Sequence, residues 1–209
     1  MVRVKICGLT REEDVEAAIE AGADAVGFIC GFPESPRNIP AARAYELIRR
    51  VPPFVESVLV TRQDFLEEDP GMVKRLMPSA LQLYGSGAGA RRLSRRLGVK
   101  LILPHLVGGD GPGLASARGF DAVLSDTYRR GWFGGTGEAS DWRLCRRLRD
   151  EIAPTPFILS GGLDPENVRD AVLRVRPYAV DVSSGVEKAP GVKDRGKMEA
   201  FVGVAKGGG

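Results

Sequence analysis

Residues 157–185, with the sequence FILSGGLDPENVRDAVLRVRPYAVDVSSG, decide the fold. A short apolar run, Phe157–Leu159, is followed by a glycine-rich turn, a segment with helical spacing and a second apolar run, Tyr178–Val182. At the start of the helical segment, Asp164 supplies a capping side chain just before Pro165, and proline suits the first position of a helix. This order is typical of a β/α unit with parallel strands, which need a crossover connection. The stretch therefore predicts one unit of an α/β domain.

The same alternation of apolar runs and helical segments continues along the rest of the chain. Helix start signals lie between the runs. Thr10 followed by Glu13 has the pattern of a capping box, and Pro40 is expected to open a second helix. The apolar runs give eight strand candidates: Val2–Cys7, Ala25–Ile29, Glu56–Val60, Ala80–Leu83, Lys100–Leu103, Ala122–Leu124, Phe157–Leu159 and Tyr178–Val182.

Eight β/α units predict a closed barrel. Closure into a (β/α)8 TIM barrel removes both sheet edges, whereas the alternative, an open doubly wound sheet, leaves two edge strands. The 209 residues lie at the short end of the size range for such a barrel and leave little room for a second domain. We therefore expect a single α/β barrel domain over residues 1–205. A flexible tail is expected at residues 206–209, because three glycines have no side chains to pack.

The composition excludes several classes of protein. With 43% hydrophobic and 27% charged residues, the chain is neither disordered nor fibrous. The net charge is +3, but acidic and basic residues alternate along most of the chain, so no nucleic-acid partner is predicted. The densest basic run, ARRLSRRL at residues 90–97, has leucines four positions apart and is typical of a solvated helix face.

Targeting and cysteine patterns point to a reduced, aqueous compartment. The N-terminal Met-Val-Arg-Val-Lys is not signal-like, and no run approaches the length of a membrane span, so we expect a cytoplasmic protein without membrane contact. The three cysteines are odd in number and far apart, which favours free thiols. Cys7 and Cys30 could face each other across neighbouring strands. No ligand-spaced His or Cys accompanies them, so neither a disulfide nor a metal site is predicted.

Two glycine-rich turns follow the last two strand candidates: Ser160-Gly161-Gly162 and Ser183-Ser184-Gly185. In barrels of this type the chemistry lies at the C-terminal ends of the strands, and these two positions often hold a phosphate on backbone N–H groups. Glycine lets an anion approach the backbone, although the same residues can also serve only to form tight left-handed turns. Because both turns occur in neighbouring units, they favour a phosphorylated small molecule as ligand.

Cys7 ends the first strand candidate and has two interpretations. A free cysteine is most often a small buried hydrophobic residue. It acts as a base only where positive charge or N–H dipoles lower its pKa from about 8.5. Lys5 lies two residues earlier, on the same face of the strand, and supplies one candidate charge. The spacing leaves both interpretations open.

Asp126 closes the sixth strand candidate and precedes a glycine-rich segment that contains Gly135. Closure of that segment over a ligand would remove solvent from the carboxyl and raise its pKa toward the range of a general acid. The alternative is a helix N-cap, but the next helix is expected about ten residues later. His105 is the single histidine and lies near the end of the fifth strand candidate. The sequence pattern points to no acid–base group that acts with it, so we expect a structural role for it.

Several motifs span nearly the whole chain: KICGLT at 5–10, SPR at 35–37, QLYG at 82–85, GGTG at 134–137 with DW at 141–142, SGGL at 160–163 with PENV at 165–168, and DVSSGVE at 181–187 with PGVKD at 190–194. No single motif is decisive, but the motifs are specific in combination. Taken in order, they resemble the phosphoribosylanthranilate isomerase family.

The resemblance implies a (β/α)8 isomerase that uses neither cofactor nor metal. Its reaction would convert N-(5′-phosphoribosyl)anthranilate into 1-(o-carboxyphenylamino)-1-deoxyribulose 5-phosphate in L-tryptophan biosynthesis. The family's general base corresponds to Cys7 and its general acid to Asp126. The contact to the anthranilate carboxylate corresponds to Arg37, whose planar guanidinium suits a carboxylate. Gln82 and Asp181 are implied as further substrate contacts. The implied phosphate-binding residues are Gly135, Gly161, Gly162, Ser183, Ser184 and Gly185.

The chain departs from the family at three places. Tyr84 stands at the usual histidine of a Gln-Leu-His-Gly motif, residues 58–61 replace a Gly-Val-Phe-Val run, and Ala139-Ser140 replaces a Thr-Phe pair. Two alternatives also stand beside the family assignment. A related isomerase of the histidine pathway performs the same rearrangement on another phosphosugar, but with a carboxylate base where this chain has Cys7. A phosphosugar-binding protein without activity would use Cys7 only in its core. The sequence does not decide between a monomer and a homodimer.

Overall fold

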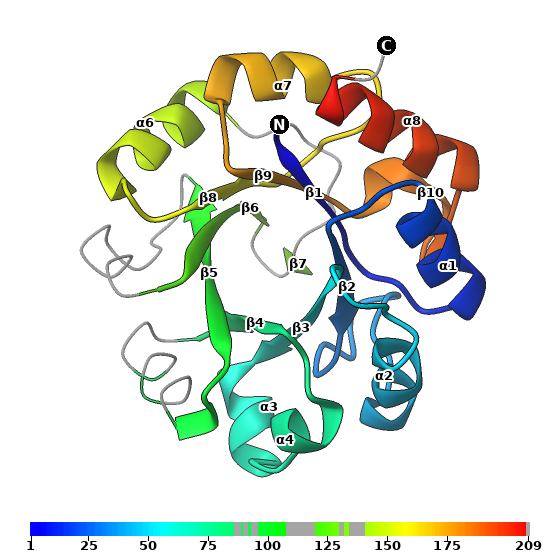
Figure 1. Cartoon of the computed structure of the whole chain (residues 1–209). Coiled ribbons are helices and arrows are strands. Elements are labelled where there is room, and N and C mark those ends of the chain that lie inside the picture. The colour runs from blue at the N-terminus through cyan, green and yellow to red at the C-terminus, as the bar shows by residue number, and fades with distance from the viewer. Residues whose placement is uncertain are drawn as a thin grey trace.

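The computed structural model of the chain describes residues 1–85, 89, 92, 96–107, 120–129, 132–133 and 141–207. Its centre is a ring of eight parallel strands, and helices surround this ring (Figure 1). The strands follow one another as β1, β2, β3, β4, β5, β6, β8 and β9, and β9 pairs again with β1. The expected (β/α)8 barrel is therefore confirmed, and the alternative of an open sheet is wrong.

Each of the eight strand candidates corresponds to one barrel strand. The bounds are β1 (Arg3–Ile6), β2 (Ala25–Ile29), β3 (Glu56–Arg62), β4 (Ala80–Tyr84), β5 (Lys100–Val107), β6 (Ala122–Arg129), β8 (Phe157–Leu159) and β9 (Ala179–Val182). Strands β5 and β6 continue well beyond their apolar runs because they pair with each other from Ile102↔Ala122 to Val107↔Thr127. A short strand β7 (Trp132–Phe133) lies antiparallel to the end of β6.

Helices and short elements connect the barrel strands. They are α1 (Glu12–Glu20), α2 (Ala41–Ile48), α3 (Gln63–Glu68), α4 (Met72–Leu76), α6 (Trp142–Ile152), α7 (Val168–Val175), the 3₁₀ turn η2 (Ser184–Val186), the hairpin strands β10 (Glu187–Ala189) and β11 (Val192–Lys193), and α8 (Arg195–Lys206).

The predicted capping box at Thr10 is wrong. The N-cap of α1 is Arg11, which makes no capping side-chain bond. The hydroxyl of Thr10 instead donates to the carbonyl of Gly191 at 2.7 Å. A contact with the loop after β10 has thus replaced the local cap, since a threonine hydroxyl bonds to whichever backbone group the fold brings near.

The two proline signals have different outcomes. Pro40 is the N-cap of α2 and marks its start. Asp164 is not the predicted N-cap, because the N-cap of α7 is Asn167; its carboxylate instead accepts the N–H groups of Glu166 and Asn167 at 3.0 and 2.9 Å. The bond closes a turn at Pro165, and the α-helix itself begins at Val168.

Apolar side chains fill two layers of core. The outer layer, between strands and helices, contains the fully buried Phe28, Phe157 and Phe201. The inner layer lies inside the barrel and includes Val58 and Ile102. Burial on both faces explains why the strands appear in the sequence as continuous apolar runs.

The cysteines occupy different layers of this core. Cys7 packs in the inner layer, whereas Cys30 packs in the outer layer and its thiol donates to the carbonyl of Ile39 at 3.0 Å. Cys7, Cys30 and Cys145 are all buried free thiols. Cys7 and Cys30 therefore do not face each other, and the absence of a disulfide between them follows from the strand geometry.

The last helix, α8, reaches almost to the end of the chain. Helix α8 includes Lys206, whose ammonium donates to the carbonyl of Gly22 and pairs with Asp24, both at 2.8 Å. Gly208 and Gly209 of the predicted tail lie outside the described residues, as does much of the basic run 90–97.

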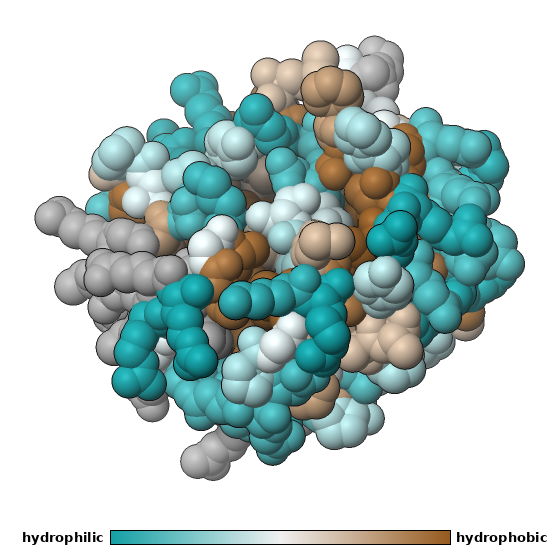
Figure 2. All heavy atoms as spheres, turned by 60° about the horizontal axis from the view of Figure 1, so that its bottom comes forward, coloured by the Kyte–Doolittle hydropathy of each residue, from teal (hydrophilic) through white to brown (hydrophobic). Residues whose placement is uncertain are grey.

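Hydrophilic side chains predominate on the face shown in Figure 2. Among the described residues, no helix has the length and apolar character needed to span a membrane.

Candidate active site

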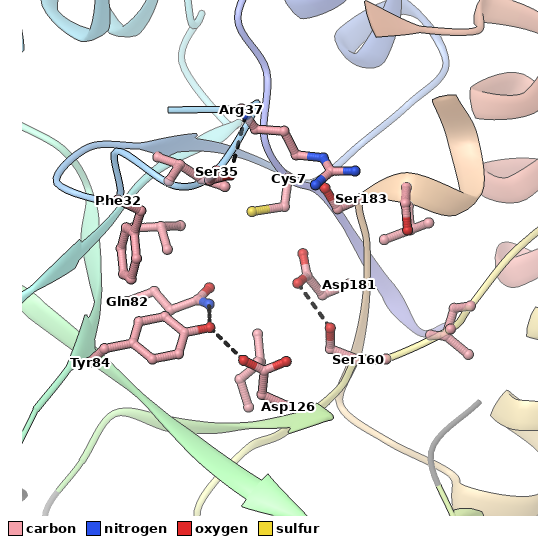
Figure 3. A pocket seen from close by; sticks show the side chains of 18 residues that line it. Cys7, Phe32, Ser35, Arg37, Gln82, Tyr84, Asp126, Ser160, Asp181 and Ser183 are labelled. Atoms are coloured by element: carbon pink, nitrogen blue, oxygen red, sulfur yellow. Dashed lines mark hydrogen bonds between the residues drawn. The ribbon is translucent and has the colours of Figure 1, made fainter. Parts of the chain in front are cut away.

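A pocket opens at the ends of the barrel strands, where the side chains of several strands converge (Figure 3). Polar and apolar side chains both line it, which suits a small-molecule ligand. Five residues expected from the sequence to act on a substrate lie around it: Cys7, Arg37, Gln82, Asp126 and Asp181. They come from separate segments that only barrel closure brings together.

Cys7 directly follows β1, and its backbone N–H donates to the carbonyl of Val182 at 2.8 Å. The thiol points into the pocket and is 5% exposed (Figure 3). Burial raises the pKa of this thiol, and the charge and hydrogen bond of Lys5 lower it only in part, so the pKa stays above its ordinary value. The Lys5 charge anticipated from the sequence is therefore present, but desolvation outweighs it.

Lys5 is buried beneath the pocket and joins two of its walls. Its ammonium lies 2.8 Å from a carboxylate oxygen of Asp181, which is its register partner on the neighbouring strand β9. It also donates to the side-chain oxygen of Gln82 at 3.1 Å. Burial lowers the pKa of Lys5, but the charges of Asp181 and Cys7 more than reverse this, so the pKa is raised overall. Lys5 consequently remains a cation close to the Cys7 thiol.

Asp126 lies across the pocket from Cys7 (Figure 3). It is 5% exposed and belongs to β6, so the alternative interpretation as a helix N-cap is wrong. The hydroxyl of Tyr84 donates to Oδ2 of Asp126 at 2.8 Å, and the amide nitrogen of Gln82 donates to that hydroxyl at 3.3 Å. Burial and the charge of Asp126 raise the pKa of Tyr84 well above its ordinary value, which keeps the phenol protonated.

Arg37 is held at the pocket by a buried carboxylate. Its Nε and Nη2 donate to the two carboxylate oxygens of Glu187 at 2.8 and 2.7 Å, a bidentate pair. The ammonium of Lys193 also donates to Glu187, at 2.8 Å, and to the carbonyl of Ser183, at 3.0 Å. The remaining nitrogen of the guanidinium, Nη1, takes part in neither bond to Glu187. The arrangement fixes the plane of Arg37 while leaving that nitrogen to contact a ligand.

The turn after β8 has the backbone geometry of an anion site. Gly161 and Gly162 have φ angles of 99° and 64°, a region that favours glycine, and both line the pocket. The side chain of Asn167 donates to the carbonyl of Gly162 at 2.8 Å, and this bond stabilises the turn. Within the described part of the chain, no acceptor takes the backbone N–H of Gly161 or Gly162. Both N–H groups are therefore candidate donors to an acceptor bound in the pocket.

The turn after β9 lies against the first. Ser183 and Ser184 line the same pocket. Gly185 does not line it; a Cβ at this position would lie 2.0 Å from the carbonyl oxygen of Leu163. Glycine is required there because the two turns approach each other more closely than a side chain permits.

Two other residues singled out in the sequence do not contribute to the described site. Gly135 lies outside the described residues, so its predicted phosphate contact stays a prediction. His105 is on β5 and does not line the pocket as defined by the described residues. Among those residues, no group of three or more His, Cys, Asp or Glu side chains could hold a metal ion.

Sequence reasoning missed Phe32, an apolar residue that lines the pocket. It also missed the polar contacts that hold the site, namely the bonds of Glu187 to Arg37 and Lys193 and the bond from Tyr84 to Asp126. Glu187 and Lys193 lie inside the motifs DVSSGVE and PGVKD. The motifs therefore marked Glu187 and Lys193 as part of the family pattern. The ion pair between Glu187 and Arg37 could not be predicted, because it joins segments that are distant in the sequence.

The fold and the site together define the class of protein: a (β/α)8-barrel enzyme whose ionisable groups gather around a pocket at one end of the barrel. Residues 4–204 match the family described as N-(5′phosphoribosyl)anthranilate (PRA) isomerase. The chain belongs to this family.

Known relatives support the assignment over nearly the whole length. The N-(5′-phosphoribosyl)anthranilate isomerase of Haloferax volcanii is 44% identical over 211 aligned residues, covering 99% of this chain and 94% of the relative. The crystal structure of phosphoribosyl anthranilate isomerase from Thermotoga maritima superposes with a TM-score of 0.86 at 39% identity, covering 99% of this chain and all of that one. A further phosphoribosyl anthranilate isomerase, solved in complex with reduced 1-(o-carboxyphenylamino)-1-deoxyribulose 5-phosphate, has a TM-score of 0.82 at 38% identity, with 99% and 100% coverage.

Proposed function

We propose that this chain carries out the reaction of its family, an Amadori rearrangement in L-tryptophan biosynthesis. The substrate is N-(5′-phosphoribosyl)anthranilate, and the product is 1-(o-carboxyphenylamino)-1-deoxyribulose 5-phosphate. The observation that carries the proposal is the placement of a thiol, Cys7, and a carboxyl, Asp126, on opposite sides of one pocket (Figure 3). A sugar ring bound between them has one group on each side for proton transfer.

In the first step, Asp126 protonates the ring oxygen of the ribose. The bond between that oxygen and the anomeric carbon breaks, and the ring opens to a Schiff base with the anthranilate nitrogen. Asp126 becomes a carboxylate as its proton leaves, and the hydrogen bond from Tyr84 stabilises the new charge.

In the second step, the ionised form of Cys7, which Lys5 stabilises and burial disfavours, removes the proton from the second ribose carbon. The electrons of that C–H bond form the carbon–carbon double bond of an enamine, which neutralises the Schiff base. The enamine then tautomerises to the ketone. Both steps are proton transfers, so neither requires a covalent adduct of the enzyme.

The other predicted contacts orient the substrate. The Gly161-Gly162 turn and the Ser183-Ser184 turn supply backbone donors for the 5′-phosphate. Arg37, held by Glu187, presents a guanidinium nitrogen to the anthranilate carboxylate. Gln82 and Asp181 complete the polar wall between the two reacting groups.

Turnover tests the proposal most simply. Freshly generated N-(5′-phosphoribosyl)anthranilate is mixed with the protein, and the loss of anthranilate fluorescence is followed. The histidine-pathway phosphosugar is assayed in parallel under the same conditions. Turnover of the first compound and not of the second supports the proposal. Turnover of only the second assigns the chain to the histidine-pathway reaction, and folded protein that binds but converts neither is a phosphosugar-binding protein.

All residues of the proposed mechanism belong to one chain, so the proposal holds for a monomer or a homodimer. The cytoplasmic location expected from the sequence stays a prediction.

A further inference from the structure

We propose that Tyr84 is a positioning residue for Asp126, which it holds in place for proton donation and stabilises once the proton has left. The inference rests on the proposed function, because it assigns Tyr84 a part in the step that Asp126 performs. Position 84 is also where this chain departs from the family's Gln-Leu-His-Gly motif.

The geometry around Tyr84 constrains both its ring and its hydroxyl. The ring meets Phe32 edge to face, with centroids 5.4 Å apart and planes at 80°. The hydroxyl lies between two polar groups, since it accepts from the Gln82 amide at 3.3 Å and donates to Oδ2 of Asp126 at 2.8 Å. Tyr84 is thus fixed at both ends, and its O–H is directed at the carboxyl (Figure 3).

The direction of the hydrogen bonds follows from Lys5. An ammonium has only donors, so the group of Gln82 that faces Lys5 must be its carbonyl oxygen. The amide nitrogen of Gln82 then faces Tyr84 and donates to its hydroxyl. Because that oxygen already accepts a hydrogen bond from Gln82, the phenol O–H is directed toward Asp126. The chain of bonds therefore runs one way, from the cation beside Cys7 to the carboxyl of Asp126.

Asp181 anchors the other end of this chain. Its carboxylate pairs with Lys5 at 2.8 Å and also accepts the hydroxyl of Ser160 at 3.3 Å. The ammonium is therefore held in place, and with it the orientation of Gln82. A hydroxyl at Tyr84 that was free to rotate could equally well accept a hydrogen bond from a protonated Asp126, but here the bond from Gln82 favours the orientation in which Tyr84 donates.

A donor to Asp126 benefits the reaction more than the resting state. Hydrogen bonds to a charged acceptor are stronger than those to a neutral one. The bond from Tyr84 therefore strengthens as Asp126 loses its proton to the ring oxygen. An interaction that grows toward the transition state lowers the barrier and appears in kcat rather than in KM.

The test compares Tyr84→Phe with wild type. The variant removes one oxygen atom and keeps the ring that packs on Phe32. Tyr45→Phe is the matched control, because it removes the same atom from a hydroxyl on α2 that only accepts from Arg49 at 3.2 Å. We expect kcat of Tyr84→Phe to fall roughly 10- to 100-fold, the range of a hydrogen bond to a charged group. KM should stay within about twofold, and Tyr45→Phe should match wild type.

The pH profile supplies a readout that a purely structural role would leave unchanged. Without the donor, the buried carboxylate of Asp126 loses stabilisation. The limb of the kcat profile that reports Asp126 should therefore move to higher pH in Tyr84→Phe.

Combination with Asp126→Asn separates this inference from the proposed function. If Asp126→Asn lowers turnover to a small but measurable rate, adding Tyr84→Phe should cause little further loss, because the two residues act on one step. Absence of turnover by folded wild type would contradict the proposed function itself, and a folded Asp126→Asn with wild-type turnover would contradict the proposed role of Asp126. Loss in Asp126→Asn with unchanged kcat and pH profile in Tyr84→Phe would overturn only the inference about Tyr84. A rise in KM alone would overturn it too, because that result makes Tyr84 a substrate contact.

Discussion

Among the residues that support the site, Glu187 is the one whose replacement should destabilise the fold most. Its carboxylate accepts hydrogen bonds from Arg37 at 2.7 and 2.8 Å and from Lys193 at 2.8 Å. The side chains of Lys193, Glu187 and Arg37 are 0%, 6% and 12% exposed, so both cations depend on this carboxylate. Glu187→Gln keeps the shape and removes the charge, which leaves two buried cations near each other without an anion.

Removing one partner of a buried ion pair lowers the free energy of unfolding by about 3–5 kcal/mol. In a domain of this size a loss of 1 kcal/mol lowers the midpoint of thermal unfolding by about 2–4 °C. Glu187→Gln should therefore lower that midpoint by roughly 6–20 °C. Glu199→Gln is the control, because its carboxylate pairs with Arg195 at 2.9 Å and both side chains are at least half exposed. That change should cost less than about 1 kcal/mol.

The pH dependence has a definite sign. Burial on its own raises the pKa of Glu187, but the hydrogen bond from Arg37 and the charge of Lys193 outweigh it, so the pKa lies below its ordinary value. A folded-state pKa below the unfolded one gives stability that is present above the unfolded value, about 4.3, and is lost as pH falls through the folded value. The difference between wild type and Glu187→Gln should therefore be largest near neutral pH and should shrink in acid.

Urea unfolding at neutral pH and at pH 4 measures the free energy of unfolding of each variant, and thermal melts measure the unfolding midpoint. If Glu187→Gln costs no more than Glu199→Gln at neutral pH, the ion triad does not stabilise the fold and the reasoning is refuted.

Three further predictions address the pocket itself. Burial outweighs Lys5 and keeps the pKa of Cys7 above its ordinary value. Alkylation of Cys7 by iodoacetamide, followed by mass spectrometry, should therefore keep rising with pH about tenfold per unit beyond pH 8.5, and a plateau below that pH would contradict this. Gly185→Ala places a Cβ 2.0 Å from the carbonyl oxygen of Leu163, so it should cost about 1–3 kcal/mol of stability and weaken phosphate binding in calorimetry. Gly196→Ala in α8, whose nearest contact is 3.4 Å away, should be neutral or mildly stabilising; equal effects of the two would count against the packing of the turns. Arg37→Lys loses the bidentate pair with Glu187 that orients the side chain, and it has no guanidinium nitrogen to present to the substrate carboxylate. KM should therefore rise about tenfold with kcat nearly unchanged, whereas an unchanged KM would show that Arg37 does not bind substrate.

Much of the fold could be predicted because its signals are local and repeated. A buried parallel strand appears as a short apolar run, and eight such runs at regular intervals favour closure. The ends of β5 and β6 were missed because those residues are polar or mixed and are held in the strands by their mutual pairing. The cap at Thr10 failed for a similar reason, since its partner, Gly191, is distant in sequence.

Sequence analysis predicted which of the proposed reacting groups lie at the pocket, and it missed the side chains that hold them in place. Cys7, Asp126 and Arg37 could be placed because they follow particular strands or occur in family motifs. The pairing of Lys5 with Asp181, and that of Arg37 with Glu187, joins opposite ends of the chain, and neither pair has a local pattern. Sequence spacing correctly identified Lys5 as a charge near Cys7. It could not weigh that charge against burial, which requires the folded environment.

The central claim is that Cys7 removes a proton and Asp126 donates one. Its most direct test is turnover of N-(5′-phosphoribosyl)anthranilate by wild type, Cys7→Ser and Asp126→Asn, with circular dichroism and product affinity measured on each. The account predicts that each variant loses on the order of 10² to 10⁴ in kcat while keeping its fold and its affinity for product. A folded variant of either residue that turns over at the wild-type rate would contradict the account.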